Sequence, residues 1–446
     1  MKNTLILNAN IVNEGNVFES DVLIKGRFID VIGKDLSSRQ ADTVIDARGK
    51  LLLPGAIDDQ VHFREPGLTH KATIASESKA AVAGGVTSFM EMPNTVPPVF
   101  TLTLLEDKYR IAARDSLANY SFFMGASNDN LEEVLKVNVA NVCGLKIFMG
   151  SSTGNLLVED EKTLEGFFSR FPSLIATHCE DENTILRNSA AYRDKFGENV
   201  PVKYHPLIRS HEACYKSSSF AIQLARKYGT KLHVLHISTA GETNLFDNSI
   251  PLAKKRITAE ACIHHLSFND TDYDRLGTLI KWNPAIKTAA DQEGVFQALL
   301  DDRIDVIATD HAPHTLAEKD NTYFKVPSGG PLIQHSLVAM LDFFHEGKIP
   351  LDRIVQKMAH NPAILFQISK RGFVREGYYA DLVIVDPRQP WVVERENILA
   401  KCGWSPFQGR QFKSRVTHTF VSGHLAYADG FFDETMKGQR LTFDRN

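Results

Sequence analysis

The sequence predicts an α/β fold, a (β/α)8 TIM barrel that carries a small β-sandwich module built from both ends of the chain. At 446 residues the chain exceeds one compact small domain, and it suits a barrel of about 250–350 residues with an added module. In the middle of the sequence, short apolar segments alternate with amphipathic helical ones, which is typical of a parallel sheet. Both ends are instead rich in short β-type segments.

The N-terminal residues 1–53 predict the first part of the β module. Turn sequences such as Asn-Glu-Gly and Lys-Gly-Arg separate the β-rich stretches. The expected strands cover residues 4–7, 21–24, 28–32, 43–45 and 50–53. We expect these strands to form a small antiparallel sheet.

Residues 54–370 predict the barrel as eight repeats of a strand followed, in most cases, by a helix. The expected strands cover residues 56–61, 87–92, 120–124, 144–148, 174–178, 232–236, 257–261 and 306–309. Helical patterns lie between most of them, for example at 73–83, 102–116 and 212–228. An open, doubly wound sheet is the alternative, but no G-x-G-x-x-G sequence opens the first unit.

The tail, residues 371–446, predicts the second part of the β module. Strands are expected at 380–385, 416–421 and 424–428, with the same length and alternation as those at the N-terminus. The simplest packing therefore places both chain ends in one β module beside the barrel.

Composition limits the cellular setting and the classes of partner. The net charge of −4 and the pI near 6.5 argue against nucleic acid and anionic membrane surfaces. The opening residues do not fit a signal peptide, and no apolar run reaches the roughly 18 residues of a membrane helix. Five scattered cysteines without a C-x-x-C pair fit reduced thiols. We therefore expect a cytoplasmic protein.

Ionisable side chains recur where the predicted barrel strands end. The carboxyl ends of all barrel strands meet at one face, which carries the active site. A single histidine or lysine there is more often structural, and a single aspartate often caps a helix. Three histidines, one lysine and one aspartate at one face instead converge on a point, and zinc-like metals prefer imidazole and carboxylate ligands. These residues are His62, Lys146, His178, His236 and Asp310.

Seven short motifs carry a resemblance to a known family. They are VHFREPG (61–67), MPNT (92–95), GLKIFMG (144–150), HCED (178–181), HIST (236–239), TDHAPH (309–314) and GWSPF (403–407). With these motifs the chain resembles the amidohydrolase superfamily and, within it, the dihydroorotases, over most of its length from residue 54. The resemblance implies the reversible hydrolysis of dihydroorotate to N-carbamoyl-L-aspartate, a step of pyrimidine biosynthesis.

The resemblance also implies a metal centre. Lys146 would be carbamylated on its ε-amine and become an anionic bridging ligand, which requires a lysine that burial holds neutral. His178 and His236 would bind one metal with it. His62 and Asp310 would bind the other. The expected cofactor is zinc, one or two ions per chain, or manganese; metal-bound hydroxide would be the nucleophile and Asp310 the general base.

The residues expected to bind the substrate are Arg64, Asn94, Asn283, His314 and, through its backbone, Leu266. Arg64 is the most informative, because an arginine fork matches a carboxylate bidentately. Dihydroorotate has a carboxylate, whereas hydantoin and dihydropyrimidine rings have none. The structural alternative for Arg64 is a salt bridge to Glu65 or Asp58. Residues 327–331 would line the rim of the pocket.

The sequence departs from the family pattern at Gln60, where a histidine is usual, and an amide oxygen is a poorer zinc ligand than imidazole. Three readings follow: a weakly bound first metal, an enzyme with one metal, or a degenerate site. In function, the alternatives are an allantoinase, hydantoinase or dihydropyrimidinase, a metal-poor scaffold for a partner such as aspartate transcarbamoylase, or, as a weaker match, a deaminase or peptide hydrolase. We expect a small-molecule substrate and a homo-oligomer such as a dimer.

Overall fold

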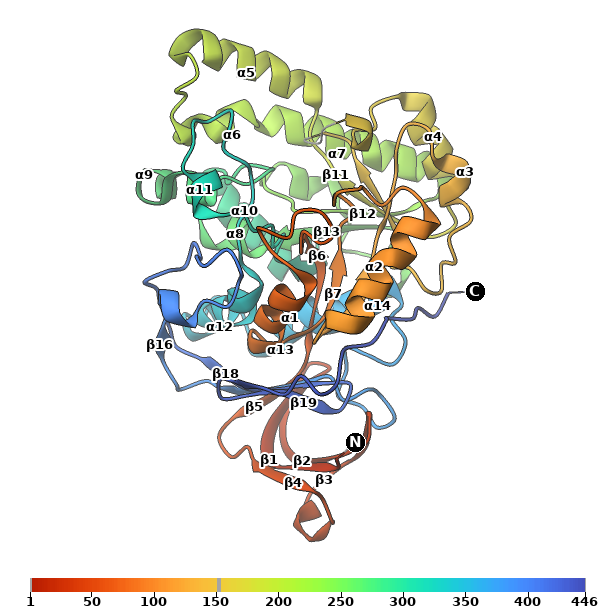
Figure 1. Cartoon of the computed structure of the whole chain (residues 1–446), viewed down its shortest axis with the longest axis vertical. Coiled ribbons are helices and arrows are strands. Elements are labelled where there is room, and N and C mark those ends of the chain that lie inside the picture. Colours follow the sequence, from red (N-terminus) through yellow and green to blue (C-terminus); the bar gives the residue numbers. More distant parts are fainter. Residues whose placement is uncertain (1, 151–153, 446) are drawn as a thin grey trace.

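The predicted barrel is present in the computed structural model, which describes residues 2–150 and 154–445 (Figure 1). Each barrel strand expected from the sequence is found, with its ends within two residues of the expected positions. The first two strands of the β module, 4–13 and 16–25, are much longer than the expected 4–7 and 21–24. Strands β6 to β8 form one parallel sheet and β9 to β14 another. Their bounds are β6 Ala56–Val61, β7 Val86–Glu91, β8 Asn119–Phe122, β9 Met124–Gly125, β10 Leu145–Phe148, β11 Leu174–His178, β12 Lys231–Val234, β13 Ile257–Cys262 and β14 Val306–Ala308.

Two junctions close the circle of strands. β8 and β9 are two parts of the third barrel strand, interrupted at Phe123, whose N–H donates to Glu91 O at 3.0 Å. At the other junction, Val61 pairs in parallel with His311, and His62 N–H donates to His311 O at 2.7 Å. The two sheets are therefore continuous at both edges, as a barrel requires.

Helices surround the barrel (Figure 1). Their bounds are α1 Ile74–Ala83, α2 Leu102–Asp115, α3 Leu131–Val134, α4 Glu161–Arg170, α5 Glu182–Phe196, α6 His205–Ile208, α7 His211–Tyr228, α8 Ile263–Ser267, α9 Tyr273–Leu276, α10 Ala289–Leu300, α11 Leu316–Lys319, α12 Ser336–His345, α13 Leu351–Val355 and α14 Asn361–Phe366. The three helices expected at 73–83, 102–116 and 212–228 are α1, α2 and α7. Within the described ranges, no helix combines the length and hydropathy needed to cross a membrane.

Strands from both chain ends form one nine-stranded sheet, as the sequence predicts. The bounds are β1 Thr4–Asn13, β2 Asn16–Lys25, β3 Phe28–Gly33, β4 Thr43–Asp46, β5 Leu51–Pro54, β15 Leu382–Asp386, β18 Arg415–Val421, β19 His424–Ala428 and β20 Phe431–Phe432. A separate short pair joins β16 Trp391–Val392 to β17 Gln411–Phe412. The two halves of the large sheet enclose their own hydrophobic core, which includes Ile6 of β1 and Ile384 of β15.

The expectation that the N-terminal strands are all antiparallel is wrong for β4 and β5. β1, β2 and β3 form an antiparallel meander. After β3 the chain crosses to the free edge of β1, where β4 and then β5 pair with β1 in parallel. Local turn signals predict neighbours along the chain, and they carry no information about this crossover.

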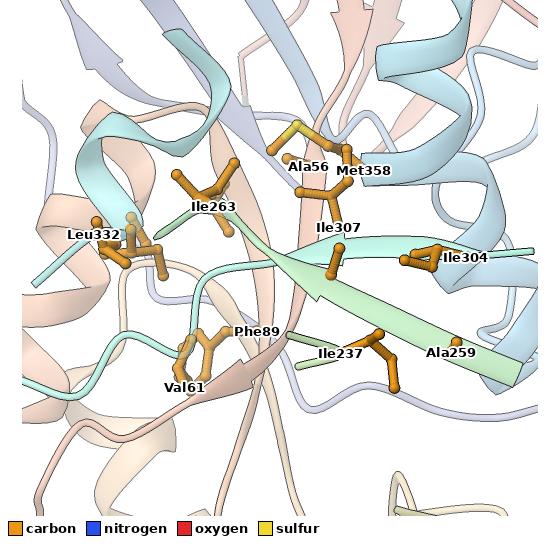
Figure 2. Packing of buried hydrophobic residues seen from close by; sticks show 14 of the residues in the cluster. Ala56, Val61, Phe89, Ile237, Ala259, Ile263, Ile304, Ile307, Leu332 and Met358 are labelled. Carbon is orange, nitrogen blue, oxygen red and sulfur yellow. The ribbon is translucent and has the colours of Figure 1, made fainter. Parts of the chain in front are cut away.

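The main hydrophobic core lies between the barrel strands and the helices around them. Every residue of β6 and β7 is buried, as expected for parallel strands covered on both faces. Figure 2 shows side chains of β6, β13 and β14, among them Ile307, gathered with Met358 in this core.

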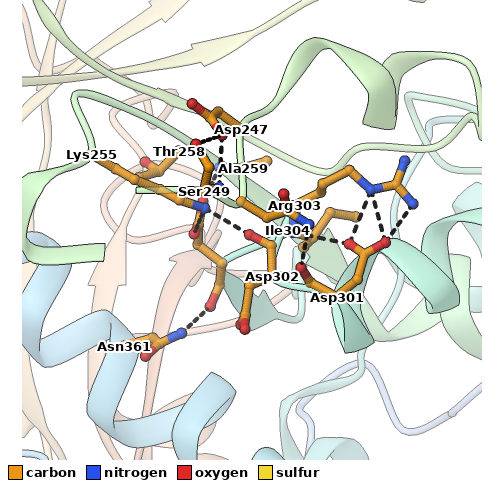
Figure 3. Close-up of polar contacts among 12 residues, drawn as sticks. Asp247, Ser249, Lys255, Thr258, Ala259, Asp301, Asp302, Arg303, Ile304 and Asn361 are labelled. Carbon is orange, nitrogen blue, oxygen red and sulfur yellow. Dashed lines mark hydrogen bonds and ion pairs between the residues drawn. The ribbon is translucent and has the colours of Figure 1, made fainter. Parts of the chain in front are cut away.

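A polar cluster fixes the amino ends of β13 and β14, at the end of the barrel opposite the predicted site (Figure 3). Asp305, just before β14, accepts bonds from Lys255 Nζ at 2.7 Å and from Ala259 N–H at 3.0 Å. Asn361 Nδ2 donates to Asp305 O at 2.6 Å. Polar contacts at this face stabilise the barrel, and the carboxyl ends are left for chemistry.

Candidate active site

The predicted site residues meet at the carboxyl ends of the barrel strands, around a cavity of about 100 Å³. His62, Asn94, His236 and Asp310 follow β6, β7, β12 and β14, while Lys146 and His178 lie on β10 and β11. The lining residues are Gln60, His62, Arg64, Asn94, Lys146, Phe148, His178, His236, Trp282, Asn283, Asp310, Ala312, Ser328 and Gly329. The structure therefore brings together all five residues predicted as metal ligands.

Three non-glycine residues of the lining adopt positive φ angles two or three residues after a strand ends. The φ angle is 68° at Arg64, 41° at His236 and 48° at Asp310. This conformation costs energy for residues with a side chain, and such outliers cluster at functional sites. Each strand turns sharply at its carboxyl end, and all three side chains line the cavity.

His178 and His236 form a pair of neutral imidazoles. His178 Nδ1 lies 2.9 Å from His236 Nε2, and His178 Nε2 lies 2.8 Å from Glu180 Oε2. Burial tends to raise the pKa of Glu180, but Arg209 and His178 lower it to about 2, so this carboxylate accepts the Nε2 proton of His178. Burial lowers the pKa of both histidines. The Nδ1 lone pair of His178 therefore points toward His236, in the manner of a metal ligand oriented by a carboxylate.

Glu260 holds the backbone of His236. The His236 N–H donates to Glu260 Oε1 at 2.9 Å, and the thiol of Cys262 donates to the same oxygen at 3.1 Å. The Glu260 carboxylate therefore holds the backbone N–H of His236, whose conformation is left-handed. Sequence reasoning did not select Glu260, because it lies within β13 and outside the recognised motifs.

Lys146 is a buried lysine with a readily lost proton. Its side chain lies in the interior of the barrel, with Nζ 4.6 Å from the centre of the Phe148 ring. Burial lowers the pKa of Lys146 to about 7, against the charges of Glu260 and Asp310, which favour the ammonium. A neutral amine at physiological pH is the form that reacts with carbon dioxide.

His62 and Asp310 form a second pair of ligand-type groups. Asn94 Oδ1 lies 2.7 Å from His62 Nδ1, which makes Nδ1 the protonated nitrogen. His62 Nε2 then presents its lone pair to Asp310 Oδ1 at 3.2 Å. Two acceptors at this distance require a proton or a cation between them.

Gln60 uses both ends of its amide within the protein. Its Nε2 lies 3.4 Å from Asp310 Oδ1, which accepts, and its Oε1 accepts from the Cys262 thiol at 3.5 Å. The residue lines the cavity with both ends of its amide in contact with protein groups. The geometry thus favours Gln60 as a support for Asp310.

A further group of side chains beneath the cavity has metal-ligand chemistry. Asp59, His233 and Glu260 are buried, and their ligand atoms lie within 4.8 Å of one another, close enough to hold one metal ion. Burial tends to lower the pKa of His233, but ion pairs with Asp59 and Glu260 raise it to about 9. A metal ion would therefore have to displace a proton from this group.

Arg64 is fixed beside the cavity by contacts other than the salt bridge to Glu65 or Asp58 considered above. Its Nε donates to Pro313 O at 3.1 Å, and one Nη lies 3.0 Å from His314 Nε2. Within the described ranges, Arg64 forms no ion pair with Glu65 or Asp58. Glu65 instead accepts from Ile74 N–H, and Asp58 accepts from Thr309.

The other predicted substrate-binding residues differ in position. Asn283 lines the cavity, and its Oδ1 accepts from Ser328 Oγ at 2.9 Å. His314 lies behind Arg64 and is not among the described lining residues. Leu266 is buried away from the lining, and its carbonyl accepts from Gln292 Nε2 at 2.9 Å.

Sequence reasoning missed Trp282 as a site residue. Its ring lines the cavity, and its Nε1 donates to Asp310 O at 3.3 Å. The side chain is also stacked on His264, with ring centres 4.6 Å apart. Its position next to Asn283 in the sequence was the available signal.

Two protein-family profiles match the chain. The profile described as the amidohydrolase family matches residues 173–426, and the profile described as dihydro-orotase-like matches residues 49–242. A dihydroorotase from Methanosarcina mazei is 32% identical over 415 residues, covering 91% of this chain and 90% of that protein. A dihydroorotase from Pyrococcus abyssi is 30% identical over 440 residues, covering 98% of each.

Solved structures similar to this chain are named for a neighbouring activity. The L-hydantoinase (dihydropyrimidinase) from Arthrobacter aurescens superposes with a TM-score of 0.93 and 25% identity, covering 99% of this chain and 100% of that one. The dihydropyrimidinase from Brevibacillus agri superposes with a TM-score of 0.89 and 25% identity, covering 100% of both chains.

Proposed function

Because the chain is a dihydroorotase-like member of the amidohydrolase superfamily, we propose that it hydrolyses the cyclic amide of dihydroorotate reversibly to N-carbamoyl-aspartate. The observation that carries the proposal is the position of Arg64. Its buried guanidinium lies in the same cavity as the predicted metal ligands and is held there by Pro313 O. An arginine in this place suits a ring that bears a carboxylate.

The donor set in the cavity fits a divalent zinc-like ion. Neutral imidazoles of His178 and His236, with nitrogens 2.9 Å apart, would hold it together with Lys146 once that amine is carbamylated. Such an ion acts as a Lewis acid on the amide carbonyl and activates water for attack. His62 and Asp310 would complete the site on the opposite side of the cavity.

Asp310 would move the proton. Its Oδ1 lies 3.2 Å from His62 Nε2 and accepts a hydrogen bond from Gln60 Nε2 at 3.4 Å. In the hydrolytic direction it would take the proton of the attacking water and deliver it to the ring nitrogen as the C–N bond breaks. In the direction of ring closure the same carboxylate would run these steps in reverse.

Gln60 would limit the site to one tightly bound ion. An amide oxygen is a weak zinc ligand, and the Gln60 amide is already engaged with Cys262 and Asp310. The ion would then belong to the Lys146, His178 and His236 side of the cavity.

The second candidate function is hydrolysis of a ring without a carboxylate, as in hydantoinases and dihydropyrimidinases. The TM-score of 0.93 to the Arthrobacter hydantoinase favours it at the level of overall structure. Within the cavity, however, such a ring would leave the buried Arg64 charge without a partner, which is unfavourable.

Dihydroorotate and dihydrouracil are a matched pair of substrates for the test, since they differ by the carboxylate. The purified, metal-loaded protein should convert dihydroorotate with a far higher kcat/KM than dihydrouracil. The opposite preference would make the protein a dihydropyrimidinase-type enzyme. Turnover of neither ring would support a scaffold without catalysis.

A further inference from the structure

His314 is the centre of a hydrogen-bonding arrangement behind Arg64. The ring Nδ1 lies 3.0 Å from Lys71 Nζ. The ring Nε2 lies 3.0 Å from Ser328 O and 3.0 Å from an Nη of Arg64. Each ring nitrogen therefore has a close polar neighbour whose hydrogen-bonding role is known.

These neighbours determine which nitrogen of His314 carries the proton. A lysine ammonium has only donors, so Nδ1 must accept from Lys71. A carbonyl oxygen has only acceptors, so Nε2–H must donate toward Ser328 O. Burial, together with the charges of Arg64 and Lys71, lowers the pKa of His314, so the ring has one proton to place. Its site is Nε2.

The same logic applies to the contact between His314 and Arg64. With Nε2 protonated, neither group can accept from the other, so the 3.0 Å contact brings two donors together. Arg64 lines the cavity, and Nε2–H lies beside its guanidinium. Because the ring donates to Ser328 O and does not accept from Arg64, the charged Nη donors remain available for an acceptor such as a carboxylate oxygen.

Lys71 is itself held from outside the cavity. Its ammonium lies 2.9 Å from Glu318 Oε1, and its side chain is only 12% exposed. Glu318 Oε2 accepts from Thr315 N–H at 2.9 Å, which ties the carboxylate to the start of α11. Burial tends to raise the pKa of Glu318, but the bond from Lys71 and that from Thr315 lower it to about 2. Lys71 thus keeps its place without belonging to the cavity lining.

We propose that Lys71 is a positioning residue for substrate recognition: it fixes His314 as its Nε2–H tautomer, so that the ring donates to Ser328 O and leaves the Arg64 Nη donors free for a substrate carboxylate. The inference rests on the proposed function for the identity of the ligand. The tautomer itself follows from the contacts of His314 and is independent of any substrate.

The tautomer is tested directly by two-bond ¹H–¹⁵N NMR of the histidine rings in the wild type and in Lys71→Met. The His314 signals are assigned by their absence in His314→Gln. We expect a protonated Nε2 and an unprotonated Nδ1 in the wild type, and a mixture of tautomers in Lys71→Met. A wild-type ring protonated at Nδ1 would overturn the proposal, whether or not the protein turns over dihydroorotate.

The consequence for recognition is tested by steady-state kinetics on dihydroorotate. In Lys71→Met the other tautomer becomes accessible, in which His314 Nε2 accepts from Arg64 and competes with the substrate carboxylate for that donor. We therefore expect KM to rise about tenfold, with kcat within about twofold. Lys71→Arg retains a donor and should restore most of the loss. Lys79→Met serves as the matched control, because it removes a lysine of α1 that is ion-paired with Glu434.

The outcomes separate the two proposals. An unchanged KM in Lys71→Met, in protein with wild-type metal content, would refute the recognition role of Lys71. A wild type that is inactive on dihydroorotate but has the Nε2–H tautomer would leave the positioning role in place and refute the proposed substrate.

Discussion

Removal of the Arg64 guanidinium should weaken binding of a carboxylate substrate by a predictable amount. Arg64 is 7% exposed, and burial lowers its pKa to about 10, so the side chain still carries its charge at neutral pH. A charge-assisted hydrogen bond contributes about 1.5–3 kcal/mol. Because Nε is taken by Pro313 O, the Nη groups remain for the ligand. Arg64→Ala should therefore cost about 3 kcal/mol, which is roughly a hundredfold rise in KM.

The assay is steady-state hydrolysis of dihydroorotate by the wild type, Arg64→Ala and Arg64→Lys, with metal content measured on each preparation. Arg64→Lys keeps the charge and loses the fork, so its KM should lie between those of the other two. Both variants should retain wild-type metal, since Arg64 contacts none of the predicted ligands in the described hydrogen bonds. A KM for Arg64→Ala within threefold of wild type would refute the assignment of Arg64 to the carboxylate.

Three further predictions concern the metal side of the cavity. Asp310→Ala should lower kcat by at least about 10³-fold, measured in the same assay, because it removes the general base; appreciable residual turnover would mean that another residue moves the proton. Gln60→His should raise the metal content from about one to about two ions per chain by elemental analysis, because imidazole is a far better zinc ligand than an amide; an unchanged count would mean that the first site is blocked for other reasons. In metal-free, CO2-free buffer, the wild type should gain stability over Lys146→Met by about 1.4 kcal/mol per pH unit from pH 7 to 9 in urea unfolding, because the pKa of Lys146 is about 7 folded and higher unfolded, so the unfolded state binds more protons there. A constant difference would mean that Lys146 stays charged when folded.

The barrel could be predicted from the sequence because its strands are short, apolar and evenly spaced. Buried parallel strands such as β7 have nearly continuous apolar sequences. In the helices between them, apolar residues recur every three to four positions. The pairing of β4 and β5 with β1 could not be predicted, because it depends on a crossover and not on a local turn. The break of the third strand at Phe123 was likewise not predicted, since the sequence indicates one continuous strand over 120–124.

The candidate site could be predicted where a motif ends a strand, and less well where a residue acts from elsewhere. His62, Lys146, His178, His236 and Asp310 all line one cavity. The residues that orient them, Glu180 and Glu260 among others, depend on contacts between strands that the sequence does not reveal. Lys71 lies in a loop after β6 and reaches His314 only in the folded chain.

Metal-dependent catalysis is tested most directly by turnover of dihydroorotate on samples loaded with increasing amounts of zinc, with bound metal counted on each sample. Activity should rise in proportion to bound metal and saturate at about one ion per chain. An absence of turnover at every metal loading would contradict metal-dependent catalysis and make Gln60 the mark of a site that binds without catalysis.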